Sequence, residues 1–226
     1  MELLKQHLTK ILLSVLTIIL LSNCVTLMTH MRFENKRNIK RYSDIKWTGT
    51  KTGIENKVRI DGFYINFHPD RFDECLIFYD DGTCAQYTPR RTNIDTLSND
   101  ISSQYYRDMH ECTKGKWGYY VGVYKVENDL ITANYYYSDF LMLCNLWRYM
   151  TKTEYKIEND STLTLIRSLN YDLTYDPTKI YQYDTIVKYR FYKSDKIPSS
   201  KNKMQKKRWM WKDKESWKKW RKKKEV

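Results

Sequence analysis

Residues 75–88 read Cys-Leu-Ile-Phe-Tyr-Asp-Asp-Gly-Thr-Cys-Ala-Gln-Tyr-Thr, with two strand-like runs on either side of Asp80-Asp81-Gly82. An Asp-Gly pair between such runs is a strong hairpin signal, because a type I′ turn needs positive φ. We therefore predict strands over Cys75–Tyr79 and Thr83–Thr88, joined by a two-residue turn. This register pairs Cys84 with Tyr79 and Cys75 with Thr88.

Runs with a mostly two-residue apolar period continue on both sides of this hairpin. Gly62 in the first of them is predicted to be a bulge or a point of close backbone approach. Closing the sheet would remove its exposed edges, so we predict an all-β fold: a single antiparallel up-and-down barrel of about eight strands, lipocalin-like. A two-sheet sandwich is the alternative, because periodicity does not distinguish closure from stacking. The further predicted strands are Val58–Phe67, Trp117–Val126, Leu130–Tyr137, Asn145–Ile157, Thr162–Leu169 and Tyr183–Lys193.

The positive charge of the chain is concentrated in its two ends. The 226 residues carry a formal net charge of +13. Residues 1–57 hold 10 Lys and Arg against 4 Asp and Glu, residues 58–198 hold 17 against 20, and residues 199–226 hold 13 against 3. The central body is therefore slightly acidic, which argues against a basic nucleic-acid-binding domain. We expect no nucleic-acid partner.

The N-terminus has the pattern of a secretory signal, because Lys5 and Lys10 precede the short apolar run 11–21. The run ends in Leu21-Ser22-Asn23-Cys24, which resembles the lipobox of bacterial lipoproteins. In that family the cysteine is acylated and becomes the mature N-terminus. The resemblance implies a signal peptide over residues 1–23 and lipid attachment at Cys24. An uncleaved signal-anchor and an ordinary signal peptide are the alternatives.

The residues after Cys24 read as a basic, polar tether over residues 24–57. Surface-exported lipoproteins of Bacteroidetes usually carry acidic residues directly after the cysteine, and residues 25–30 contain none. By that resemblance, we expect an outer-membrane lipoprotein that faces the periplasm.

Several short motifs of the predicted barrel domain, residues 58–198, resemble those of a known group of proteins. They are Asp61-Gly62-Phe63-Tyr64, Leu76–Thr83, Trp117-Gly118-Tyr119-Tyr120 and Tyr155-Lys156-Ile157 followed by Ser161-Thr162-Leu163. They resemble uncharacterised small β-barrel lipoproteins of Bacteroides-like bacteria. The resemblance supports the fold and the location, and it implies no reaction.

Four cysteines remain once Cys24 is assigned to lipid: Cys75, Cys84, Cys112 and Cys144. They allow three sets of pairings in an oxidising compartment. In the predicted hairpin, Cys75 and Cys84 share a face but lie roughly 13 Å apart along the strands, whereas a disulfide needs α-carbons within about 7 Å. That pair is excluded, and the remaining pairings or four free thiols stay open.

No catalytic motif emerges from the chain. It lacks a Gly-x-Ser-x-Gly elbow, a phosphate-binding glycine loop and a His-Glu-x-x-His pair. No close CxxC pair suggests a metal site. We therefore expect no enzyme activity, no cofactor and no metal.

The C-terminal tail, residues 199–226, combines Trp with Lys and Arg. On a helix, Trp209, Met210, Trp217 and Trp220 fall within about 100° of arc. An interfacial helix is one interpretation, with membrane-surface contacts from Trp209, Trp217, Trp220, Lys218, Lys219 and Arg221. Packing of Trp209 and Trp211 against the barrel, or a disordered tail, are the others.

Two functional hypotheses follow. In the first, the barrel binds a small apolar or aromatic-stacking ligand, or serves a structural role. The candidate lining residues are Tyr64, Tyr119, Tyr120, Tyr135 and Tyr137, for which core packing is the alternative. In the second, the protein tethers or assembles envelope components through its basic tail. Protein partners cannot be named from the residues.

Overall fold

The structure is a computed structural model of the whole chain. It describes residues 10, 12–17, 22–23, 25–27, 29–30, 37–66, 74–87, 119–141, 144–172, 180–183, 187–195, 197–200 and 203–224. The described strands are β1 (Gly62–Asn66), β2 (Glu74–Phe78), β3 (Thr83–Tyr87), β4 (Tyr119–Glu127), β5 (Leu130–Leu141), β6 (Cys144–Asn159), β7 (Thr162–Asp172), β8 (Ile180–Tyr183) and β9 (Val187–Lys193).

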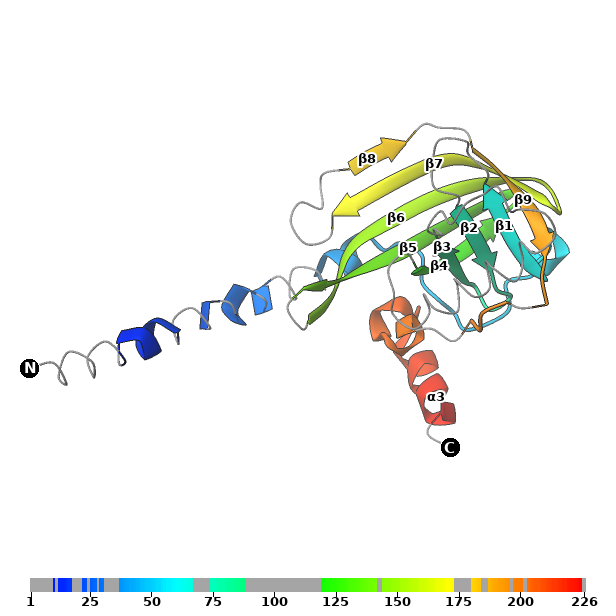
Figure 1. Cartoon of the computed structure of the whole chain (residues 1–226). Helices are drawn as coiled ribbons and strands as arrows, with labels where there is room; N and C mark the ends of the chain where they lie inside the picture. Colours follow the sequence, from blue (N-terminus) through cyan, green and yellow to red (C-terminus); the bar gives the residue numbers. More distant parts are fainter. Residues whose placement is uncertain are drawn as a thin grey trace, which may run out of the picture.

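These strands form one closed antiparallel barrel (Figure 1). Strands β1 to β7 pair in chain order, and β9 pairs with both β7 and β1. Strand β8 lies against residues 168–171 of β7, while β9 lies against residues 162–165, so the two are successive parts of the eighth strand. The predicted up-and-down barrel is confirmed, and its closed ring excludes the two-sheet sandwich.

The turn between β2 and β3 differs from the predicted one. Cys75 pairs with Tyr87 rather than Thr88, so the loop holds three residues, Asp80-Asp81-Gly82. Within this loop only Gly82 has a positive φ, of 85°. A type I turn followed by a left-handed residue has this form, and its twist also suits a hairpin. The predicted type I′ turn and its register were wrong by one residue.

The shifted register places the two hairpin cysteines on opposite faces of the sheet. Cys84 pairs with Phe78, three residues from Cys75, and successive side chains of a strand alternate between faces. Both are buried free thiols, Cys84 inside the barrel and Cys75 outside. The exclusion of this disulfide is confirmed, but the predicted shared face was wrong. Cys24, Cys112 and the side chain of Cys144 lie outside the described residues.

One end of the barrel is closed by the chain that precedes β1. The 3-10 helix η1 (Ile54–Asn56) buries Ile54 completely in the interior, and Val58 packs in the same cluster. A Cβ on Gly62 would lie 2.0 Å from the carbonyl oxygen of Tyr192, so the predicted close approach is confirmed. The first strand therefore begins at Gly62, later than predicted.

The segment directly before the barrel strands and the C-terminal segment cover the outer face of β4, β5 and β6. The backbone N–H of Trp47 donates to the oxygen of Met210 over 2.7 Å, and the N–H of Lys212 donates to the oxygen of Trp47 over 2.9 Å. The C-terminal elements are η3 (Lys203–Lys206), η4 (Arg208–Met210) and α3 (Lys214–Lys224). We call the buried residues here the outer-face cluster: Ile39, Ile45, Trp47, Val121, Val123, Tyr136, Met150, Met210 and Trp211.

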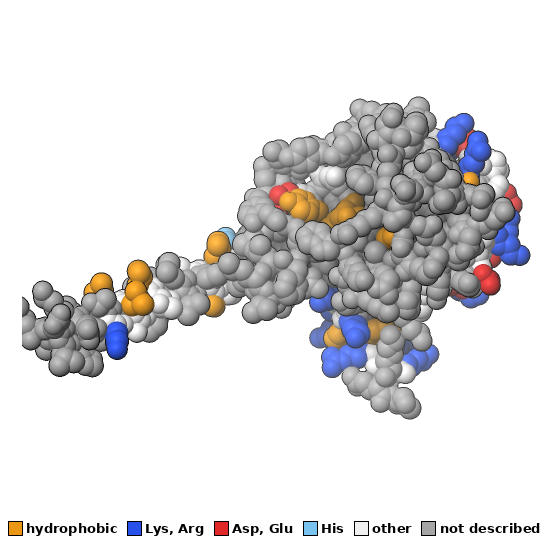
Figure 2. Space-filling model, viewed as in Figure 1, with side chains coloured by type: hydrophobic (Ala, Val, Ile, Leu, Met, Phe, Trp, Pro, Cys, Tyr) orange, Lys and Arg blue, Asp and Glu red, His pale blue; other side chains and the backbone are white. Residues whose placement is uncertain are grey.

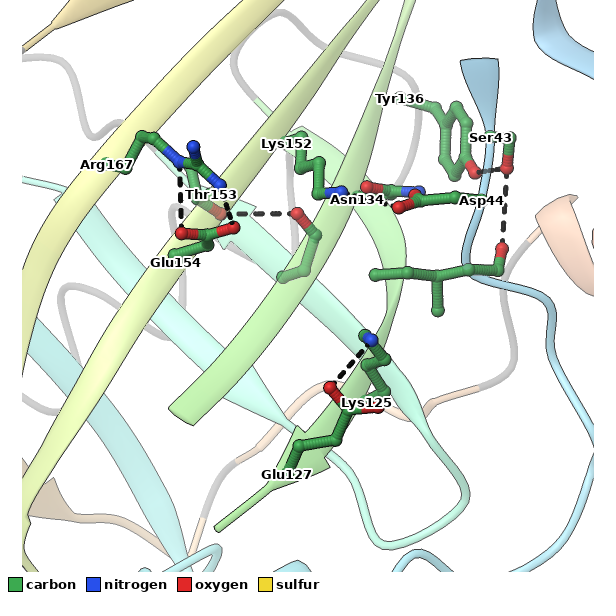
Figure 3. Close-up of polar contacts among 12 residues, drawn as sticks. Ser43, Asp44, Lys125, Glu127, Asn134, Tyr136, Lys152, Thr153, Glu154 and Arg167 are labelled. Carbon is green, nitrogen blue, oxygen red and sulfur yellow. Dashed lines mark hydrogen bonds and ion pairs between the residues drawn. The ribbon is translucent and has the colours of Figure 1, made fainter. Parts of the chain in front are cut away.

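Polar contacts beside this cluster fix the N-terminal segment (Figure 3). The carboxylate of Asp44 accepts hydrogen bonds from Asn134 Nδ2 over 3.1 Å and from Lys152 Nζ over 2.5 Å. The hydroxyls of Ser43 and Tyr136 also bond to each other. Burial raises the pKa of Asp44, but these hydrogen bonds outweigh it and hold the pKa below its ordinary value. Part of the segment assigned to the tether is thus bound to the barrel.

Candidate functional site

The barrel interior changes character along its axis. Near the short hairpin turns it is mainly apolar, with Ile54, Val58, Phe78, Ile131 and Leu163 buried together. Toward the opposite end, the inward-facing positions are mostly polar. We call these residues the polar half: Asn66, Glu74, Gln86, Tyr120, Tyr137, Thr151 and Asn170.

Strand register places the polar half inside the barrel. Gln86 pairs with Leu76 on one side and with Tyr120 on the other, so the three side chains share a face. Leu76 belongs to the interior cluster, and Tyr120 packs against it. This cluster includes the rings of Tyr64, Tyr135 and Tyr155. Gln86 therefore points inward, among aromatic rings.

Hydrogen bonds and ring contacts organise the polar half. The hydroxyl of Tyr189 donates to Glu74 Oε2 over 2.6 Å. The hydroxyl of Thr151 donates to the hydroxyl of Tyr137 over 2.8 Å. The rings of Tyr120 and Tyr137 are tilted by 44°, with centroids 4.0 Å apart. Carboxylate, phenol and amide groups thus converge from β2, β3, β4, β5 and β9.

Two buried polar atoms at this site have no hydrogen-bond partner. They are Oε1 of Gln86, whose residue is 6% exposed, and the hydroxyl of Tyr135, whose residue is 0% exposed. Most buried polar atoms in proteins are hydrogen-bonded, and an unsatisfied one calls for an explanation. Both lie on the inner face of the barrel, where a bound molecule would meet them.

Access to the polar half increases along the strands. Tyr135 is fully buried, whereas Tyr137, which follows it on the same face of β5, is half-buried. Tyr149 and Asp172, a cross-strand pair farther along this face, are half-buried as well. The interior therefore becomes solvent-accessible toward this end. The connections there, residues 67–73, 88–118 and 173–179, lie outside the described residues.

The buried phenols and the buried thiol of the interior are held in their neutral forms. Burial raises the pKa of Tyr135, Tyr155 and Tyr189 well above the ordinary value, and the carboxylate of Glu74 adds to the effect at Tyr189. Burial likewise raises the pKa of the Cys84 thiol. Neutral phenols and a neutral thiol make poor nucleophiles at pH 7, so these groups are suited to hydrogen bonding and stacking.

The structure separates the five candidate tyrosines. Tyr120, Tyr135 and Tyr137 lie together at the polar half. Tyr64 lies nearer the closed end, where its hydroxyl donates to the backbone oxygens of Arg59, before β1, and of Asp160, in the turn between β6 and β7, over 3.0 and 2.9 Å. The side chain of Tyr119 lies outside the described residues. The sequence alone does not single out Gln86, Glu74, Thr151 and Asn170, because their inward orientation follows only from the strand register.

The predicted membrane-surface residues divide into two groups. The ring of Trp209 contacts that of Tyr136 at 5.0 Å, and Trp217 and Trp220 are half-buried against the outer-face cluster. By contrast, Lys218, Lys219 and Arg221 are exposed. Lys and Arg side chains gather around α3 (Figure 2). The tryptophans thus contact the protein, and the cations face solvent.

The described part of the chain has neither a metal-binding cluster nor a membrane-spanning helix. It holds no group of three or more His, Cys, Asp or Glu that could bind a metal. None of its helices is both long and apolar enough to cross a bilayer. Cys24 lies outside the described residues. The chain matches no family model, no curated protein and no solved structure.

Proposed function

We propose that the barrel binds a small ligand in the polar half of its interior without catalysing a reaction. The observation that carries the proposal is the pair of buried, unpartnered atoms, Gln86 Oε1 and the Tyr135 hydroxyl. An unsatisfied buried polar group costs about 1–3 kcal/mol, which a bonded ligand would recover. The adjacent, tilted rings of Tyr120 and Tyr137 offer an aromatic surface beside these atoms.

A thermal-shift screen tests this proposal. The full chain is melted with a panel of small apolar and aromatic compounds, and hits are repeated with Gln86→Met. We expect this variant to lose the shift, whereas Lys125→Met, an exposed position on the outer face, should keep it. A flat panel, together with a crystal structure in which side chains fill the interior, would reject the proposal.

The proposal also includes an anchor at Cys24, on the periplasmic side of the outer membrane, as in small lipocalin-like lipoproteins. The residues before Cys24 support it, and the closed barrel agrees with the fold expected from that resemblance. Lipid chains contribute about 0.8 kcal/mol per buried methylene. Metabolic labelling with a fatty acid should mark the wild type and not Cys24→Ala. Equal labelling of both would refute the assignment.

A second candidate function is attachment of the basic tail to an anionic membrane. It is favoured by the pairing of Trp47 with residues 210–212, which brings α3 close to the segment that leads back to Cys24. A polybasic surface near a lipid anchor gains about 1 kcal/mol per cation. Truncation of the tail is a poor test, because it would also remove buried Met210 and Trp211.

A charge-only variant tests this candidate more sharply. In a Cys24→Ala background, Lys218, Lys219 and Arg221 are replaced by Gln, and sedimentation with phosphatidylglycerol vesicles is measured at about 50 and 300 mM salt. We expect binding to fall in low salt. The matched control replaces three exposed barrel cations, Lys156, Lys188 and Arg190, by Gln. An equal loss in both triple variants would contradict a specific role of α3.

A further inference from the structure

The two segments that cover the outer face of β4, β5 and β6 are both strongly basic. Residues 37–47 hold 4 Lys and Arg against 1 Asp, and residues 205–223 hold 10 Lys and Arg against 2 Asp and Glu. The backbone pairing of Trp47 with Met210 and Lys212 brings the two segments together. Lys and Arg side chains gather around α3, at the end of the second segment (Figure 2). Two basic segments that are distant in sequence therefore form one surface.

Lys46 lies where these two segments meet. It stands between Ile45 and Trp47, which are buried in the outer-face cluster, and it is itself half-buried. This partial burial lowers the pKa of Lys46, and the charges of Arg208 and Lys40 lower it further. Both of these cations therefore lie near its ammonium group, Lys40 from its own segment and Arg208 from the tail. We call these three residues the basic junction.

The nearest carboxylate does not pair with Lys46. Asp44 acts to raise the pKa of Lys46, so its charge is felt there. Its two oxygens, however, accept hydrogen bonds from Asn134 and Lys152 (Figure 3). Among the described residues, Lys46 has neither an ion-pair partner nor a hydrogen-bond partner. A half-buried cation beside two others is unfavourable unless an anion compensates it.

The tail contributes a guanidinium that can bind a further group. Arg208 forms no ion pair among the described residues, and its Nη1 donates one hydrogen bond, to the Trp211 oxygen over 3.4 Å. Asp213 lies near enough to Arg208 to have its pKa lowered by it, but its Oδ1 accepts the backbone N–H of Ser216 over 2.7 Å. An arginine has five N–H donors. Most of those of Arg208 are therefore left for an acceptor outside the chain.

We propose that the basic junction binds a phosphate-type oxyanion, carried by a lipid headgroup or by a soluble molecule. The site lies outside the barrel and is separate from the polar half, so it goes beyond the proposed ligand site. A phosphate group offers several acceptor oxygens, and a guanidinium binds two of them in parallel. Its negative charge compensates the three cations. Because the anion touches both segments, its binding stabilises the docked tail.

Pyrophosphate is the probe for this chemistry. Its binding is measured by calorimetric titration of the full chain with Cys24→Ala, near pH 7 and about 150 mM salt. We expect saturable binding that raises the melting temperature by about 2–4 °C. The double variant Lys46→Gln, Arg208→Gln should bind about tenfold more weakly or not at all. The matched control Lys188→Gln, Arg190→Gln removes one Lys and one Arg from exposed positions of β9 and should keep the affinity.

The stability of the ligand-free protein separates an anion site from a structural role. Its neighbours repel Lys46, so Lys46→Gln alone should leave the melting temperature without pyrophosphate unchanged or slightly higher. A clear fall would show that this side chain supports the fold, and it would overturn the proposal. If the double variant does not fold, Lys40→Gln replaces it, because Lys40 is exposed and its loss leaves the outer-face cluster intact. This variant should also weaken pyrophosphate binding.

Vesicles distinguish the two sources of the phosphate. For a lipid headgroup, the double variant should sediment less with phosphatidylglycerol vesicles than its parent, and pyrophosphate should release the parent. For a soluble molecule, both should sediment equally while only the parent binds pyrophosphate. The proposal fails if the parent does not bind pyrophosphate, or if the double variant binds it equally well. It also fails if replacing Lys218, Lys219 and Arg221 of α3 by Gln abolishes this binding.

Discussion

Replacing Trp211 with Ala tests whether the C-terminal tail is part of the folded protein. The Trp211 side chain is 3% exposed, and its ring centroid lies 4.3 Å from that of Trp47 and 5.6 Å from that of Trp220. Its Nε1 donates to the backbone oxygen of Gln205 over 2.9 Å. Loss of a buried Trp side chain costs about 3–5 kcal/mol. The unsatisfied oxygen of Gln205 adds about 1 kcal/mol or more.

We therefore expect Trp211→Ala to lower the free energy of unfolding by about 4 kcal/mol, a large share of the 5–15 kcal/mol typical of folded proteins. Urea unfolding followed by far-UV circular dichroism measures this difference. The matched control is Lys212→Ala, an exposed neighbour that keeps its backbone bond to Trp47 and should change stability by less than about 0.5 kcal/mol. A loss below about 1 kcal/mol for Trp211→Ala would refute the packing of the tail as a source of stability.

Three further outcomes follow from the geometry of the barrel. Gly82→Ala forces a φ of 85° on a residue with a Cβ and brings that atom to 3.1 Å from the Thr52 side chain. The urea midpoint should therefore fall by the equivalent of about 1–2 kcal/mol. An unchanged midpoint would contradict the left-handed turn. The thiols of Cys75 and Cys84 are buried with raised pKa values, so a thiol reagent should modify them only after unfolding, and modification in the native state would contradict their burial. Burial raises the pKa of Tyr135 above its unfolded value, so at high pH the native state keeps a proton that the unfolded state releases. The free energy of unfolding should therefore decline as the pH rises above about 10. Full ionisation of the native tyrosines near pH 10, measured by phenolate absorbance, would disprove this.

The barrel could be predicted from the sequence because its signals are local. A two-residue apolar period and short turn-forming segments occur within each hairpin, so they do not depend on distant residues. The closing helix η1 and the docked tail are different. Their burial depends on which distant surface each one meets, as when Trp211 packs against Trp47. The same Trp pattern is equally compatible with a membrane surface, so the residues alone left both interpretations open.

The candidate site was predicted only in its aromatic part. Tyr120, Tyr135 and Tyr137 were selected because aromatic residues on strands are common lining groups, and the structure brings them together. Gln86 and Glu74 were missed, because a polar residue on a strand most often marks the solvent-facing side. Their inward direction depends on strand register, which the hairpin prediction had wrong by one residue.

That single residue determines the chemistry of the interior. A shift of one residue in strand pairing moves every side chain of the strand to the other face. With a two-residue turn, Gln86 would pair with Ile77, so Cys75 and Ile77 would point inward and Glu74 outward. The three-residue loop instead pairs Gln86 with Leu76 and so turns Glu74 into the barrel, where it accepts the hydrogen bond of Tyr189. The length of the loop at Asp80-Asp81-Gly82 thus determines that a carboxylate, and not the neighbouring thiol of Cys75, lies inside the barrel as the acceptor for the Tyr189 hydroxyl.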